Sequence, residues 1–148
     1  VSNMSAPREL NSIVLGKRGT DSALLHDHHA FAILGGDPAS GRPTRLAIPV
    51  ELHESVSPYS SINGEPWDWY AWTHTGLYLF ELDTDAANPL LSPLGQMVVE
   101  EENSSDGHYG YGSQRDRALL SEHGAYYVHQ GEVWSAPYEN PWNMDGPK

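Results

Sequence analysis

The chain has 148 residues, 39% of them hydrophobic, and its 20 acidic residues outnumber 8 basic ones, giving a formal net charge of −12. The length suits a single domain with a real core, while the acidic surface repels nucleic-acid phosphates and anionic lipid headgroups, which excludes both as expected partners. The absence of cysteine excludes disulfides, zinc–thiolate sites and cysteine nucleophiles, and no apolar run approaches the roughly 20 residues of a membrane-spanning helix.

Residues 1–21 are polar and mixed, and we expect them to form an N-terminal extension with a single strand at "SIVLG" (12–16). The first residue is valine instead of methionine, which we interpret as the sign of a processed or excised piece of a longer protein. No signal-peptide pattern is present.

Short β-type runs separated by turn residues follow the extension. "HAFAIL" (29–34) and "RLAIPVEL" (45–52) flank "GGDPASGRP", which predicts a hairpin with a wide loop. "TGLYLFELD" (75–83) alternates strongly and predicts a strand, and "LLSPLGQMVVEE" (90–101) ends in a strand at 97–100. We expect residues 55–73 and 102–114 to be insertions between these strands.

The C-terminal part of the chain predicts three further strands, at 117–120, 125–129 and 133–137. Gly131 joins the last two in a tight hairpin, although its two-residue turn lacks the favoured Asn-Gly pair. Residues 138–148 form a proline-rich tail. Because no segment shows sustained helical periodicity, we predict an all-β antiparallel domain over residues 22–137, with one four-strand group and one incomplete group.

These phrases, in this order, resemble bacterial secreted proteins that carry a C-terminal β-propeller domain. The matching positions are Asp27, His28, Ala30 and Phe31, residues 46–50, residues 76–82, Gly95, and Arg117 with Tyr127 and Val128. The resemblance implies β-propeller blades, an extracellular or periplasmic location, and no particular reaction. Since a closed ring needs at least about four blades, one full blade plus a partial one implies completion by the remainder of a larger propeller protein or by a homo-oligomer.

The "HDHHAF" run is the first candidate site. In an extended chain, alternation places His26 and His28 on one face and Asp27 and His29 on the other. Two imidazoles at this spacing bind zinc, copper or nickel when a third ligand arrives from a neighbouring strand. The candidates for that third ligand are His53, His74 and His123.

A structural role for the same run is the alternative. Asp27 and His28 would then hydrogen-bond to the backbone and to a buried arginine, which would fix strand ends between blades. The resemblance adds Arg117, at the start of the second unit, to this structural set.

Two acidic loops are candidates for calcium. "DTDAAN" places Asp83, Asp85 and Asn88 in one turn, where their oxygens could hold the ion. The turn lacks the glycine and the closing glutamate of an EF-hand, so a plain turn rich in aspartate and asparagine is the alternative. "EEENSSDG" (100–107) is a second oxygen-rich loop, for which weak calcium binding and a solvated loop are the two interpretations.

The aromatic stretch "PWDWYAWTHTGLY" (66–78) is a candidate ligand platform. Alternation places Trp67 and Trp69 on one face and Tyr70 and Trp72 on the other. Exposed, these rings would stack on sugars or on a proline-rich peptide. Buried, they would serve packing or a subunit interface.

The leading functional interpretation is a non-enzymatic β-propeller-type segment of an exported protein that acts in binding or assembly. A carbohydrate- or ester-directed hydrolase, with Asp27 and His28 at a pocket, is an alternative, although the sequence contains no "GxSxG" nucleophile motif. A binding module for calcium or zinc is the other alternative.

Overall fold

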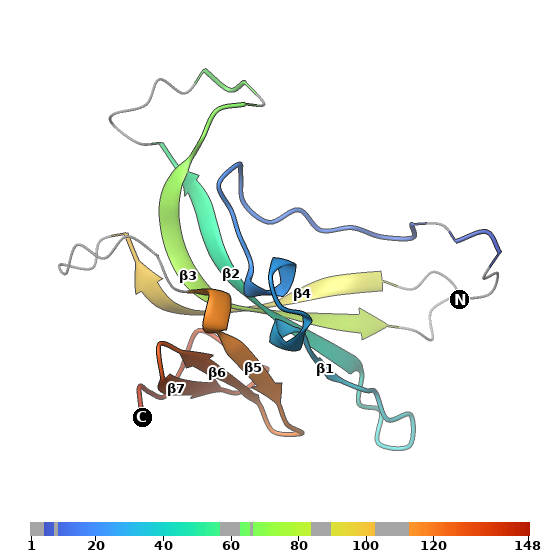
Figure 1. Cartoon of the computed structure of the whole chain (residues 1–148). Coiled ribbons are helices and arrows are strands. Elements are labelled where there is room, and N and C mark those ends of the chain that lie inside the picture. Colours follow the sequence, from blue (N-terminus) through green and yellow to red (C-terminus); the bar gives the residue numbers. More distant parts are fainter. Residues whose placement is uncertain (1–4, 8, 57–62, 66, 84–89, 103–112) are drawn as a thin grey trace.

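The computed structural model describes residues 5–7, 9–56, 63–65, 67–83, 90–102 and 113–148. Within them the strands form two antiparallel sheets (Figure 1). The first sheet contains β1 (Ala32–Leu34), β2 (Thr44–Ser55), β3 (Ala71–Asp83) and β4 (Leu90–Glu101), and the second sheet contains β5 (Arg117–Leu120), β6 (Ala125–His129) and β7 (Glu132–Ala136). The prediction of an all-β antiparallel fold is confirmed. The helices in this described part are short 3-10 turns, and none of them has the length and apolar character needed to cross a membrane.

The long hairpin of β2 and β3 gives the first sheet its two apolar faces. Thr44 lies opposite Leu82 at one end, and Leu52 lies opposite His74 towards the other. Because successive side chains of a strand point to opposite faces, the inner face collects Ala47, Leu77, Leu79 and Met97, and the outer face collects Val50, Leu52, Tyr78 and Phe80.

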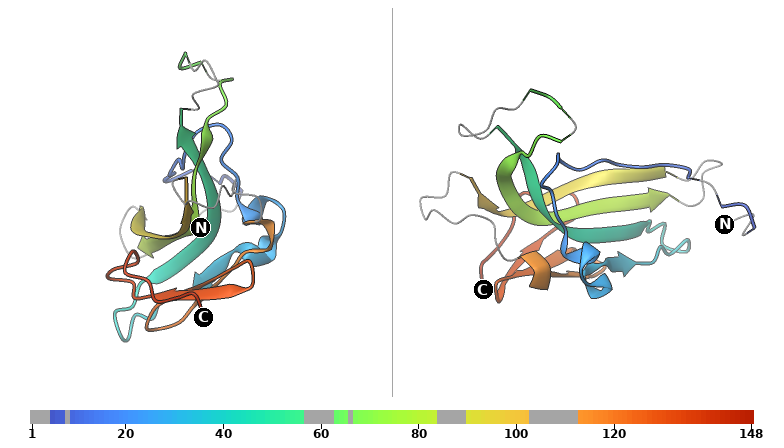
Figure 2. Two further views of the ribbon diagram at one scale, coloured as in Figure 1. Left: turned by 90° about the vertical axis from the view of Figure 1, so that its left-hand side faces the viewer. Right: turned by 45° about the horizontal axis from the view of Figure 1, so that its top comes forward.

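The second sheet packs on the inner face of the first, as the two views of Figure 2 show. Its contribution to the shared core comes from β6, β7 and the residues after β7: Ala125, Tyr127, Trp134, Ala136 and Tyr138. Fully burying a large apolar side chain contributes about 1.5–3 kcal/mol. The interface between the two sheets is therefore the main stabilising feature of the described fold.

The N-terminal segment covers part of the outer face of the first sheet. Ile13 and Leu15 pack against the outer-face cluster, while Val14 between them is 88% exposed. The expected strand at 12–16 is wrong, because this segment lies across a sheet face and pairs with no strand there. Backbone pairing begins only afterwards, where the Lys17 N–H donates to the His53 carbonyl at 2.8 Å.

The expected extended run at 29–34 is also wrong in its first half. The chain forms the 3-10 turns η1 (Ala23–Leu25) and η2 (His28–Ala30), and the strand starts only at Ala32. Each turn is capped by a preceding polar residue: the Ser22 hydroxyl accepts from Leu24 N–H and the Asp27 carboxylate from His29 N–H. These caps favour a turn over an extended strand.

The other strands follow the predicted order, with different limits. β3 begins at Ala71, inside the expected insertion at 55–73, and β4 occupies the whole of Leu90–Glu101 instead of only its end. β1 and β2 form the predicted hairpin with its wide loop. Residues 103–112 of the second expected insertion lie outside the described residues.

The last hairpin and the tail complete the second sheet. Gln130 and Gly131, with φ values of 51° and 88°, form a two-residue turn between β6 and β7, which is the backbone shape that suits the twist of paired strands. The tail then runs back along β7, and pairs of backbone hydrogen bonds join Asp145 to Ser135 and Lys148 to Val133. The outer edge of β7 is therefore covered by the chain itself.

Candidate functional site

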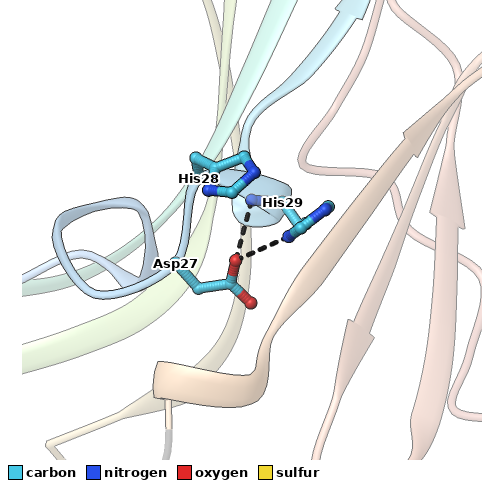
Figure 3. Close-up of side chains that lie close together, drawn as sticks. All are labelled: Asp27, His28 and His29. Carbon is cyan, nitrogen blue, oxygen red and sulfur yellow. Dashed lines mark hydrogen bonds and ion pairs between the residues drawn. The ribbon is translucent and has the colours of Figure 1, made fainter.

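Asp27, His28 and His29 lie together in the turn that leads into β1 (Figure 3). One ligand atom from each side chain lies within 4.8 Å of the other two. Asp27 Oδ1 accepts a hydrogen bond from the His29 backbone N–H at 2.9 Å and contacts His29 Nδ1, also at 2.9 Å. The two imidazole rings lie with their centroids 4.1 Å apart. We call these three residues the turn cluster.

Arg117, at the start of β5, holds the other oxygen of Asp27. Its Nη2 forms an ion pair with Asp27 Oδ2, and its Nη1 donates to the Asp116 carbonyl at 2.7 Å. The hydrogen bonds from His29, together with the charge of Arg117, outweigh desolvation and hold the pKa of Asp27 below its usual value. The ionised carboxylate thus links the entry to the first sheet with the first strand of the second sheet.

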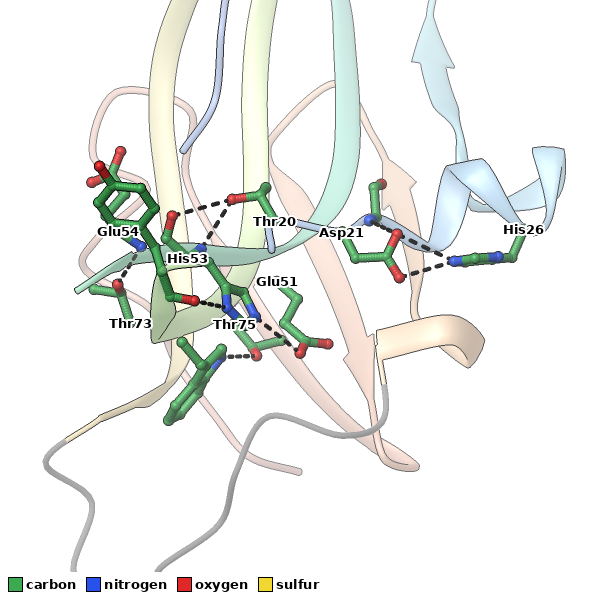
Figure 4. A network of polar contacts seen from close by, with 11 residues as sticks. Thr20, Asp21, His26, Glu51, His53, Glu54, Thr73 and Thr75 are labelled. Atoms are coloured by element: carbon green, nitrogen blue, oxygen red, sulfur yellow. Dashed lines mark hydrogen bonds and ion pairs between the residues drawn. The ribbon is translucent and has the colours of Figure 1, made fainter. Parts of the chain in front are cut away.

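His26 lies outside the turn cluster. Its Nε2 contacts the two carboxylate oxygens of Asp21 at 2.9 and 3.2 Å (Figure 4). The predicted sharing of one face by His26 and His28 depended on an extended chain, and the capped turn brings His29 to Asp27 instead.

The three candidate third ligands also lie elsewhere. His53 Nδ1 contacts the Tyr70 carbonyl at 2.9 Å, and His74 Nε2 contacts the Tyr78 hydroxyl at 2.8 Å. His123 is exposed in the turn between β5 and β6. None of the three belongs to the turn cluster.

Most residues of the two predicted calcium sites lie outside the described part of the chain. Asp83 is the exposed last residue of β3, whereas Asp85 and Asn88 lie outside the described part, as do residues 103–107 of the second acidic loop. Calcium binding at either loop stays a prediction.

The three tryptophans of the aromatic stretch occupy two environments. Trp67 and Trp69 are exposed, whereas Trp72 is buried in β3 and donates from Nε1 to the Thr75 hydroxyl at 3.1 Å. The Arg18 guanidinium lies over the Trp69 ring at 4.6 Å and donates to the Trp67 carbonyl at 2.8 Å. Stacking of a ligand on the two exposed rings stays a prediction, and Trp72 does not share their surface.

The sequence did not predict a buried polar network that lies between the two sheets. Asp116 is 1% exposed and accepts hydrogen bonds from the Tyr127 hydroxyl and from His129 Nδ1, the latter at 2.9 Å. On its other side His129 Nε2 lies 3.2 Å from a carboxylate oxygen of Glu100, in β4. The network therefore joins β4 of the first sheet to β6 of the second.

The charge state of this network follows from its surroundings. Burial disfavours the imidazolium of His129, but hydrogen bonds and negative charge from Asp116 and Glu100 outweigh burial and raise its pKa. Burial and the neighbouring Asp116 raise the pKa of Tyr127, so its hydroxyl keeps its proton and donates. Because the His129 side chain is nearly inaccessible, the arrangement fits a structural clamp better than a reaction centre.

Alternation along β6 contained the signal for this network. Ala125 and Tyr127 point into the core, and the same period places His129 on that inward face. A histidine at a core position calls for a buried acceptor. Its partner Asp116 is 13 residues away, and no spacing rule connects the two.

Within the described residues, the outer face of the second sheet is only partly covered, and its side chains are apolar apart from those of Arg117 and Ser135. Leu119 of β5 is 62% exposed and Tyr126, opposite it in β6, is 39% exposed. Val128 and Val133 pair on the same face and are half-buried. The corresponding outer face of the first sheet has Ile13 and Leu15 packed upon it, so the two sheets differ in how far the described chain covers them.

Comparisons with known proteins agree with this architecture. A family model described as a beta propeller domain matches residues 1–140. No curated protein and no solved structure matches the chain.

Proposed function

Because this chain belongs to the beta propeller domain family, we propose that it acts in binding or assembly, as a non-enzymatic segment of a propeller that further sheets complete. The observation that carries this proposal is the only partly covered outer face of the second sheet, where Leu119 and Tyr126 are exposed.

The interface within the chain supports the proposal. The inner faces of the two sheets already pack on each other through side chains such as Leu77 and Met97 on one side and Tyr127 and Trp134 on the other. Propellers repeat this kind of contact around a ring of at least about four sheets. Two described sheets leave the outer face of the second sheet without the neighbour that a ring provides.

Charge favours one occupant of this face. The chain carries a formal net charge of −12, so copies of it repel each other. We therefore assign this face to a further propeller sheet from another part of the same protein, in preference to a second copy of this segment. Because Leu119 is 62% exposed, burying the rest of it there contributes about 1–2 kcal/mol.

Native mass spectrometry of the protein isolated from its source tests the proposal. A mass that includes additional polypeptide beyond the 16.3 kDa of this chain supports it. A mass that is a multiple of 16.3 kDa would show that copies of the chain occupy the face instead of a further sheet. A bare 16.3 kDa species would contradict assembly altogether. Because the assigned sheet belongs to the same protein, replacing Leu119 by aspartate in the isolated protein should lower its urea midpoint, whereas Leu25→Asp, at an exposed leucine of η1, should not.

An extracellular or periplasmic location is part of the same proposal. Its support is the resemblance to exported propeller proteins. Fractionation of source cells tests it, and recovery of the protein with the cytoplasm would contradict it.

A further inference from the structure

We propose that the turn cluster of Asp27, His28 and His29 is a binding site for one divalent transition-metal ion, with the carboxylate and both imidazoles as ligands. This site goes beyond the assembly role and does not depend on it, because all three ligands come from one turn of this chain.

The separation of the ligand atoms fits such an ion. Zinc lies about 2.0–2.2 Å from nitrogen and oxygen ligands, so two ligand atoms of a tetrahedral site are about 3.3–3.6 Å apart. The atoms of the turn cluster lie within 4.8 Å of one another. His28 is exposed and the His29 side chain is 73% exposed, so both rings are free to rotate towards the carboxylate and close the difference without disturbing the core.

The backbone explains why three consecutive residues converge. Successive side chains of a 3-10 turn diverge by about a third of a turn each. Asp27, however, is the extended residue before η2, with φ −148° and ψ 113°, and its side chain folds back to cap the turn. The carboxylate therefore lies over the residues that follow it, beside His29 Nδ1.

Neighbouring groups already hold the carboxylate in position. Arg117 occupies Oδ2, and the backbone N–H of His29 donates to Oδ1. Oriented carboxylates of this kind are typical of metal sites, where outer hydrogen bonds fix the ligand. At present Oδ1 and His29 Nδ1 meet at 2.9 Å, a contact in which a cation can take the place of the shared proton.

The donor set selects the class of ion. Imidazole nitrogen suits zinc, copper and nickel, whereas calcium takes oxygen ligands. Two imidazoles and one carboxylate therefore favour a transition metal. Three protein ligands leave the fourth tetrahedral position to water.

Calorimetric titration with zinc chloride, at neutral pH in a buffer that does not bind zinc, tests the site. We expect saturable binding of one ion per chain. His28→Ala and His29→Ala should each weaken binding at least about tenfold, since even outer-shell partners have effects of this size. His123→Ala and His26→Ala are matched controls that should leave the affinity unchanged, because His123 lies in another turn and His26 contacts Asp21.

A second measurement needs no variant. In nitrogen-15 NMR spectra of histidine side chains, zinc should shift the ring resonances of His28 and His29 and leave those of the buried His129 in place. Absence of saturable binding by the unaltered chain overturns the proposal. Binding that survives both alanine variants, or that shifts other histidines instead, overturns it as well.

Discussion

Replacing Asp116 by asparagine should cost the protein about 3 kcal/mol of unfolding free energy. The substitution keeps the shape of a side chain that is 1% exposed, but it removes the charge that faces His129 and turns one acceptor into a donor. Breaking a buried ion pair costs about 3–5 kcal/mol, and leaving a buried donor unsatisfied costs about 1–3 kcal/mol. The lower part of the first range applies, because Glu100 still faces the imidazole.

Urea unfolding followed by tryptophan fluorescence measures this loss, since Trp134 lies in the core beside Tyr127 and His129. Tyr127→Phe removes only one hydroxyl donor of the network and should cost about 1 kcal/mol. Asp145→Asn, at an exposed aspartate of the tail, is the control for a change of charge and should stay within about 0.5 kcal/mol.

The double variant of Asp116 and Tyr127 completes the cycle. Its loss should be smaller than the sum of the single losses, because the two side chains share a hydrogen bond. A loss below about 1 kcal/mol for Asp116→Asn, or one equal to that of the exposed control, would refute the reasoning that the network is a buried clamp.

Three further predictions concern the same fold. The pKa of His129 is raised in the folded protein, so the stabilisation by its charged form is complete below the unfolded pKa of about 6.5 and is lost as pH rises through the higher folded pKa. The free energy of unfolding, measured between about pH 6 and pH 9, should show this decline, and His129→Gln should flatten it. Equal slopes of unfolding free energy against pH in the variant and the unaltered chain would contradict this prediction. Gly76→Ala should lower the urea midpoint, because a Cβ there would lie 2.5 Å from the Met97 carbonyl oxygen, a clash worth about 1–3 kcal/mol; an unchanged midpoint would show that the strands move apart freely. Leu77→Ala, at a fully buried position, should cost about 2–5 kcal/mol in the same assay, and a loss no larger than that of Leu119→Ala would place Leu77 outside the core.

Alternation predicted the strands well, because strand periodicity depends on near neighbours and on which face is buried. In β2 and β3 the apolar residues switch faces at each step, and the register that follows brings Ala47 opposite Leu79. The same rule failed at Ser22 and Asp27, where one side-chain oxygen captures a backbone N–H two residues ahead and bends the chain into a turn. Such local competition is invisible to a period count.

The contacts that define the candidate sites were harder to predict, because they join residues far apart in the chain. Arg117 reaches Asp27 across 90 positions, and nothing in either neighbourhood specifies the other. The turn cluster lies within the "HDHHAF" run that the sequence analysis selected. The sequence predicted His26 beside His28, whereas in the structure His29 lies beside Asp27 and His26 contacts Asp21. Which side chains of this run lie together therefore depends on the local conformation of the backbone.

One protected edge in each sheet bears on how this protein can associate. β7 already receives a strand-like partner from its own tail at Asp145 and Lys148, and β4, the last strand of the first sheet, carries Pro93, which has no N–H to offer. Open edges recruit strands from other chains, the route called β-augmentation, and the same route leads to fibres. A strand from another molecule would have to displace the tail to join β7. At the β4 and β7 edges, association by strand addition is therefore disfavoured relative to the stacking of sheet faces.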